Sequence, residues 1–245
     1  MTSSPILSVE NLVKAYNGVT AVDNISFSIA EGTCFGLLGP NGAGKTTTIE
    51  IMENILAPDA GRILYRGNKR TKQFNQDIGI QFQQTQLMGF LSVAETLKTF
   101  AAFYDCPLAL EEVISLCQLD EIRDKMNDKI SGGQRQRLLL GLALVNDPHL
   151  IFLDEPSTGL DPQARHNVWD IIRDVKSRGK TVVLTTHYME EAEQLCDTIA
   201  IMDRGKIIET GSPRELIQKH CRDMDLPLQN LESVFLKLTG RHLKD

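Results

Sequence analysis

The chain has 245 residues, of which 42% are hydrophobic and 24% charged, and its formal net charge is −6. This length suits one large α/β domain, and the acidic balance argues against general nucleic-acid binding. No apolar run approaches the roughly 20 residues of a membrane-spanning helix, and the N-terminus lacks a signal-peptide pattern. The cysteines never show C-x-x-C spacing, which predicts buried, reduced thiols of a cytosolic protein and neither disulfides nor a zinc site; they are Cys34, Cys106, Cys117, Cys196 and Cys221.

The first two predicted strands, residues 7–16 and 21–29, form an antiparallel pair. In the second strand apolar residues alternate with serines, which is the period of a half-buried strand, and Asn17-Gly18 supplies the turn. Tyr16 lies just before that turn. It is placed to stack on a nucleotide base, although a tyrosine at a strand end more often only packs.

A phosphate-binding loop follows the next strand, residues 34–38. Residues 39–46 fit the pattern G-x-x-x-x-G-K-[ST], and a helical pattern with Ile49, Met52, Ile55 and Leu56 on one face leaves them. The glycines let the backbone approach phosphate, Lys45 reaches the β- and γ-phosphates, and the Thr46 hydroxyl is placed on Mg²⁺. The predicted nucleotide site comprises Gly39, Pro40, Asn41, Gly42, Ala43, Gly44, Lys45, Thr46 and Thr47.

The middle of the chain predicts a helical insert at residues 85–145. Weaker strand patterns at 62–65 and 77–83 precede it, and helical patterns occupy 93–104 and 111–117, the first with Val93, Leu97, Phe100, Ala101 and Tyr104 on one face. Ser131-Gly132-Gly133-Gln134 then begins another helix with Ser131 at the N-cap. Its free N–H groups suit an anion, but for this short motif alone an ordinary capped helix is the better explanation.

Two carboxylates end the strand that follows this helix. Four apolar residues, 150–153, predict a parallel strand buried on both faces, and Asp154 and Glu155 come directly after them. Asp154 is placed to hold Mg²⁺ through water and Glu155 to polarise an attacking water; the alternative is a charged turn. A tight loop at 156–161, a helix with an apolar stripe at 168–175 and a buried strand at 181–186 follow. His187 ends that strand, and we predict a γ-phosphate contact for it.

The C-terminal part predicts a hairpin and a helix. Residues 199–202 and 206–209 pair around Arg204-Gly205, and Asn230 caps an amphipathic helix that Gly240 ends. Patterning alone does not separate an edge helix that covers the core from a docking surface.

The phosphate-binding loop, Ser-Gly-Gly-Gln, the strand with Asp-Glu and the downstream histidine occur in the order found in ATP-binding subunits of ABC transporters. The chain resembles this family over nearly its whole length. The resemblance implies an ATPase that uses ATP and Mg²⁺, with Tyr16 as the base-stacking aromatic and Gln83 as a loop glutamine that senses the metal and the membrane partner. Gln83 is chosen over its neighbouring glutamines by the I-G-I-x-F-Q pattern. It also implies a γ-phosphate contact to the ATP of an opposite subunit by Ser131, Gly132, Gly133 and Gln134, and a link between the two sites by Asp161.

The fold expected from these elements is an α/β P-loop NTPase core with a mostly parallel sheet, an N-terminal antiparallel β subdomain and a helical insert. In a single ABC ATPase domain, 1–245, residues 1–84 and 146–220 form the nucleotide-binding core. Residues 85–145 form the helical subdomain with the Ser-Gly-Gly-Gln motif, and residues 221–245 the C-terminal helix.

The function implied is that of a motor subunit: a homodimer with ATP at its interface, catalytic Glu155 and His187, and a separate integral membrane permease as partner. Residues 185–193 and 231–240 resemble exporter ATPases for drugs, lipids or polysaccharides, and no β-rich regulatory domain of the importer type follows. We therefore expect an exporter subunit that is peripheral on the cytoplasmic face of the inner membrane and binds no nucleic acid. The alternative is a soluble ABC-type ATPase uncoupled from transport, but the DNA-repair type needs a long coiled coil and the ribosome type a second domain. A kinase or GTPase leaves Ser131–Gln134 and His187 unexplained.

Overall fold

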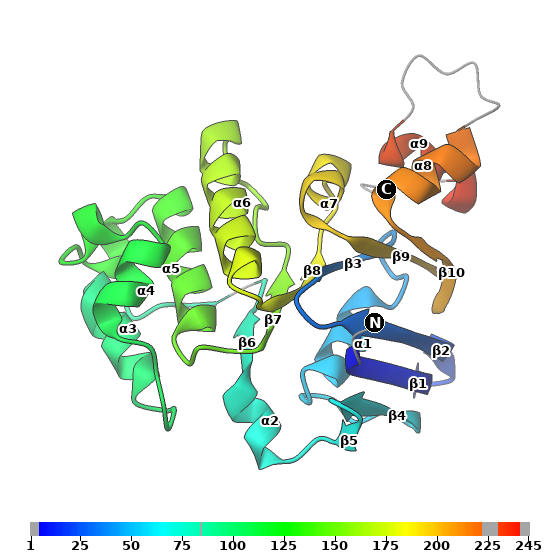
Figure 1. Cartoon of the computed structure of the whole chain (residues 1–245), viewed down its shortest axis with the longest axis horizontal. Coiled ribbons are helices and arrows are strands. Elements are labelled where there is room, and N and C mark those ends of the chain that lie inside the picture. The colour runs from blue at the N-terminus through cyan, green and yellow to red at the C-terminus, as the bar shows by residue number, and fades with distance from the viewer. Residues whose placement is uncertain (1–4, 84, 222–229, 241–245) are drawn as a thin grey trace. The chain divides into compact units, whose positions relative to one another are not determined.

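The computed structural model describes residues 5–83, 85–221 and 230–240 (Figure 1). The chain divides into two compact units, one made of Met1–Arg70 and Val183–Asp245 and the other of Thr71–Val182. Strand β8 (Thr181–Thr185) carries the chain from the second unit back to the first. The predicted division into core, helical subdomain and C-terminal helix stays a prediction.

The first unit contains an antiparallel sheet with the strand order β2-β1-β4-β5. Asn17 and Gly18 both have positive φ, 48° and 83°, which is the conformation of the two-residue turns that match strand twist. The predicted pair is confirmed, because β1 runs antiparallel to β2 up to the contact of Tyr16 with Val19. The strands are β1 (Pro5–Tyr16), β2 (Val19–Ala30), β4 (Ala60–Tyr65) and β5 (Asn68–Lys69).

The same unit holds strands β10, β9 and β3 side by side. Strand β3 (Cys34–Leu38) is fully buried and runs parallel to β9 (Thr198–Asp203), as a continuous apolar run predicts. Strand β10 (Lys206–Gly211) turns back from β9 through Arg204-Gly205, where φ is 46° and 80°. The predicted hairpin is confirmed. Strand β8 lies directly beside β3, on the side opposite β9.

Within its described residues, the first unit also contains the helices α1 (Lys45–Met52), α7 (Met189–Leu195), α8 (Pro213–Cys221) and α9 (Leu231–Thr239). The helix predicted between Asn230 and Gly240 is confirmed by α9. The Asn230 side chain accepts a hydrogen bond from the Ser233 amide at 3.0 Å, and Gly240 ends the helix with φ 69°. The predicted extension of α1 to Ile55 and Leu56 is wrong, because Asn54 takes φ 68° and the Ile55 side chain is exposed.

The second unit places helices around a parallel strand pair. Strand β6 (Ile78–Gln81) pairs with β7 (Leu150–Asp154), and α5 packs on β6. A Cβ atom on Gly79 would collide with the Ala143 carbonyl oxygen, so this packing requires glycine. The helices are α2 (Lys72–Asp77), α3 (Val93–Ala101), α4 (Leu110–Leu116), α5 (Gly132–Leu144) and α6 (Pro162–Ser177), with 3₁₀ turns at Asp120–Ile122 and Asn127–Lys129.

Several predictions in this unit need correction. The strand predicted over 77–83 is only Ile78–Gln81, and α2 replaces its beginning. Helix α3 ends at Ala101, so Tyr104 lies outside it. On the predicted face Val93 and Leu97 are buried, whereas the Phe100 side chain is exposed. Cys106 is also exposed, unlike the other cysteines, although all five thiols are free as predicted. None of the helices in the described ranges has the length and apolar character that crossing a bilayer requires.

Candidate functional site

The phosphate-binding loop joins β3 to α1 inside the first unit. Gly44 has φ 101°, and a Cβ atom on it would collide with the Ala21 carbonyl oxygen and lie 2.8 Å from Met202 Cε. A Cβ atom on Gly39 would collide with the Met202 carbonyl oxygen. The loop therefore needs these two glycines for packing as well as for an approach to phosphate. Gly44 is also the N-cap of α1 and offers no side-chain cap, which leaves the N–H groups of that helix end for an anion.

The Lys45 ammonium donates hydrogen bonds to the backbone of its own loop. Its Nζ donates to the carbonyl oxygen of Gly39 at 2.7 Å and to that of Pro40 at 3.1 Å. Both acceptors are neutral carbonyls, so a phosphate oxygen would be a stronger partner for the same charge. Thr46 is exposed at the first turn of α1, while the Thr48 hydroxyl is buried and donates to the Gly44 carbonyl at 2.9 Å.

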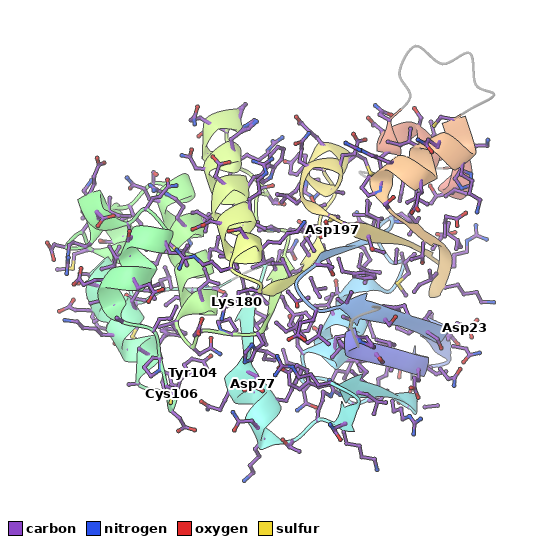
Figure 2. The ribbon with its side chains drawn as sticks, in the orientation of Figure 1. Asp23, Asp77, Tyr104, Cys106, Lys180 and Asp197 are labelled. Carbon is purple, nitrogen blue, oxygen red and sulfur yellow. The ribbon has the colours of Figure 1, made fainter. Side chains whose placement is uncertain are left out.

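The strand that aims this loop is fixed at its other end by Asp197. The Cys34 amide donates to Asp197 Oδ2 at 2.8 Å, and the Asp197 amide donates to the Cys34 carbonyl at 2.8 Å. Figure 2 labels Asp197. The Cys34 and Cys196 sulfur atoms lie 4.0 Å apart. The neighbouring Cys34 thiol and burial raise the pKa of Cys196, so it stays a neutral packing group.

Tyr16 and His187 are the other predicted site residues of this unit. Tyr16 ends β1 with 43% of its surface exposed, and Lys14 Nζ lies 5.7 Å from its ring centroid. His187 is half-buried and follows β8, the neighbour of β3. Its ring lies 4.2 Å from the Tyr188 ring, centroid to centroid, at an angle of 38°. Tyr16 is thus partly exposed with a lysine beside its ring, and His187 packs against its neighbour Tyr188.

The second unit brings Gln83 and Glu155 together although they are far apart in the sequence. Asp154 ends β7 half-buried, and Glu155 follows with φ 51°, a left-handed conformation that is uncommon for any residue but glycine. Gln83 Nε2 donates to Glu155 Oε2 at 3.0 Å. The Thr158 hydroxyl donates to the same oxygen at 3.1 Å. Thr158 was not among the predicted residues, although a hydroxyl three positions after a carboxylate in a turn is a recognisable signal.

Two helix N-termini of this unit carry the remaining predicted residues. Ser131 caps α5: its hydroxyl accepts from the Gln134 amide at 3.3 Å, and the Gln134 side chain accepts from the Ser131 amide at 2.9 Å. This is a complete capping box. Gly132 has open space where a Cβ would be, whereas a Cβ on Gly133 would lie 2.9 Å from Ala164 Cβ. Asp161 caps α6 by accepting from the Ala164 amide at 2.9 Å.

The donor chemistry fits Mg²⁺. Thr46, Gln83 and Asp154 offer a hydroxyl, an amide and a carboxylate oxygen, which are the hard ligands this ion takes. Within the described ranges no three His, Cys, Asp or Glu side chains are grouped to hold a metal by themselves.

Comparison with known proteins places the chain in a family. Residues 22–158 match the family described as "ABC transporter". Nod factor export ATP-binding protein I of Ralstonia nicotianae is 43% identical over 223 residues, which are 88% of this chain and 70% of the relative. The structure of cbiO1 from Clostridium perfringens, part of the ABC transporter complex cbiONQ, is similar with a TM-score of 0.79 and 28% identity, covering 91% of this chain and 96% of that one.

A dimeric bacterial ABC transporter cassette is similar with a TM-score of 0.74 and 25% identity, covering 84% of this chain and 98% of the other. These likenesses confirm the expected P-loop α/β fold with a mostly parallel sheet and an antiparallel N-terminal sheet. The family match spans more than half of the sequence, and the relative is matched over more than two thirds of its length. The chain therefore belongs to the ABC transporter family, as an ATP-binding subunit with ATPase activity.

Proposed function

We propose that this chain is the motor subunit of an exporter, and that it acts on the cytoplasmic face of the membrane with a separate permease. The relatives named for Nod factor export support the direction of transport. The proposed ATP hydrolysis rests on the Glu155 carboxylate. This group directly follows β7 and accepts hydrogen bonds from Gln83 and Thr158. A carboxylate held in one orientation is suited to accept a proton from a water molecule at one position.

In the proposed cycle, Tyr16 stacks on the adenine and the phosphate-binding loop surrounds the triphosphate. Lys45 leaves the carbonyls of Gly39 and Pro40 for the β- and γ-phosphates. Thr46, Gln83 and Asp154 would hold Mg²⁺, which would supply positive charge beside the phosphates. Glu155 accepts a proton from the attacking water. His187 contacts the γ-phosphate. Ser131, Gly132, Gly133 and Gln134 bind the γ-phosphate of the ATP held by the partner copy, and Asp161 lies in the loop that links the two sites across the dimer.

The permease contact is proposed for an apolar cluster of the second unit, formed by Met88, Phe90 and Met126. These side chains are 59%, 76% and 45% exposed. Their segments are joined, because the Asn127 amide donates to the Leu91 carbonyl at 2.9 Å and Asn127 Nδ2 to the Met88 carbonyl at 2.9 Å. Exposed large apolar side chains gathered in one place mark an interaction surface.

Co-expression with a candidate permease, a membrane protein of about six spans, tests the coupling to transport. We expect tagged chain to recover that protein from detergent-solubilised membranes, and Phe90→Ser with Met126→Gln to reduce the recovery. Ile208→Ser is the matched control, since it removes an exposed apolar side chain of β10 in the other unit. A chain that hydrolyses ATP but recovers no membrane protein would favour the soluble ABC-type ATPase.

A further inference from the structure

The turn after β7 orients the Glu155 side chain through contacts of its own. The Thr158 hydroxyl donates to Glu155 Oε2 at 3.1 Å, and the Thr158 amide donates to the Glu155 carbonyl at 3.2 Å. Glu155 itself has φ 51°, and Gly159 in the same turn has φ 76°. Thr158 therefore contacts Glu155 twice, at the main-chain carbonyl through its amide and at the carboxylate through its hydroxyl.

The orientation of that carboxylate matters for proton transfer. A glutamate side chain has several rotamers, and only some aim an oxygen at a given water molecule. A hydrogen bond to Oε2 fixes the plane of the group and with it the direction in which Oε1 accepts a proton. Small misplacements of a general base reduce the rate strongly, because proton transfer needs hydrogen-bond geometry at the reacting atom.

Gln83 and Thr158, which both donate to Glu155 Oε2, lie at different distances from Glu155 along the chain. Gln83 lies in the loop after β6 and reaches Glu155 across 72 positions of sequence. In the proposed cycle it also serves Mg²⁺, so its contact with Glu155 changes when nucleotide binds. Thr158 belongs to the same turn as Glu155 and has no other proposed task. Its side chain is exposed, so the hydroxyl is not required to fill the core.

We propose that Thr158 is a positioning residue for ATP hydrolysis, whose hydroxyl holds the Glu155 carboxylate in its reactive orientation while Gln83 exchanges partners. The inference rests on the proposed role of Glu155 as the base. Thr158 itself touches no reacting atom and acts only through Glu155.

Steady-state kinetics of Thr158→Val and Thr158→Ser test the proposal. Valine keeps the shape of threonine without the hydroxyl, and serine keeps the hydroxyl. We expect Thr158→Val to lower kcat about tenfold, the loss of one hydrogen bond to a charged group, with KM for ATP near the wild-type value. Thr158→Ser restores kcat. Equal kcat for Thr158→Val and wild type would overturn the proposal, as would an equal loss in both variants.

Two controls separate positioning from a structural effect. Thr99→Val removes an exposed hydroxyl of the same unit that donates to the Glu95 carbonyl at 2.8 Å, and it should leave kcat unchanged. In a Glu155→Gln background, Thr158→Val should cause no further loss, because the group it positions is gone. A further loss there would overturn the inference. Full activity of Glu155→Gln alone would instead contradict the proposed function.

Discussion

At the scale of single residues, predicted site residues of each unit form hydrogen bonds within that unit. Lys45 donates to two loop carbonyls, and Glu155 accepts from Gln83 and Thr158. Each of these contacts is intramolecular and pairs a charged group with a neutral one. Lys45 can therefore exchange its carbonyl acceptors for phosphate oxygens, and Glu155 can exchange a donor for a water molecule, without leaving either charge unpaired.

His187 gives a residue-scale prediction. If it contacts the γ-phosphate, His187→Ala should lower kcat by roughly 10²–10³-fold, the cost of losing one donor to a developing negative charge. The melting temperature should stay near that of the wild type, because the side chain is only half-buried. His166→Ala is the control, since that exposed ring also packs on an aromatic neighbour, Trp169, at 4.9 Å between centroids. A large drop in melting temperature for His187→Ala would contradict the contact and indicate a core histidine.

At the scale of elements, helices α3 and α5 of the second unit both begin with a capping box. Ser92 caps α3 with Glu95 at the third position, and Ser131 caps α5 with Gln134 there. Hydrogen bonds from the Ser92 amide and hydroxyl lower the pKa of Glu95, so this box is charged at neutral pH. The two caps are alike in geometry, but only the N-terminus of α5 is proposed to meet ATP.

Ser92→Ala and Ser131→Ala therefore separate capping from binding. Losing a serine cap costs about 1 kcal/mol. For a chain of this size that lowers the melting temperature by about 2–4 °C, and we expect a drop of at least this size in both variants. Only Ser131→Ala should also reduce turnover and ATP-dependent dimerisation. Calorimetry with an ATPase assay checks this, and equal turnover in the two variants would leave α5 as an ordinary capped helix.

At the scale of the whole molecule, the chain carries two helix N-termini suited to anions, at Gly44 and at Ser131. One triphosphate satisfies the first. We predict that the second binds the ATP of another copy, so that two ATP molecules close one two-fold symmetric interface. Hydrolysis removes the bridging γ-phosphate, and the dimer should then dissociate.

Light scattering on the Glu155→Gln protein tests this prediction. The change retains the shape of the side chain but not its basicity, so a dimer should accumulate with Mg·ATP and be absent with Mg·ADP or without nucleotide. Ser131→Arg in the same background should prevent dimerisation by placing a bulky side chain at the interface. A species that stays monomeric with Mg·ATP at high protein concentration would contradict the mechanism, and so would a dimer unaffected by Ser131→Arg.

The sequence by itself determined the features that depend on neighbouring residues. The glycine spacing of residues 39–46, the Asn17-Gly18 turn, the caps at Ser131 and Asn230, and the buried runs of β3 and β7 are local patterns, and the structure has each of them. They were sufficient for the fold class and the family, because backbone conformation and burial are encoded over a few positions.

Only the tertiary structure decided which distant groups meet. Gln83 reaches Glu155, and Asp197 fixes the start of β3 at Cys34, through contacts between residues with no sequence pattern in common. It also decided where patterns stop: α1 ends at Met52, before Ile55, and Phe100 of α3 remains exposed although it fits the helical period. The reason is physical. A periodic pattern states which side of an element is apolar, but burial requires a partner surface, and that surface is supplied by other parts of the chain.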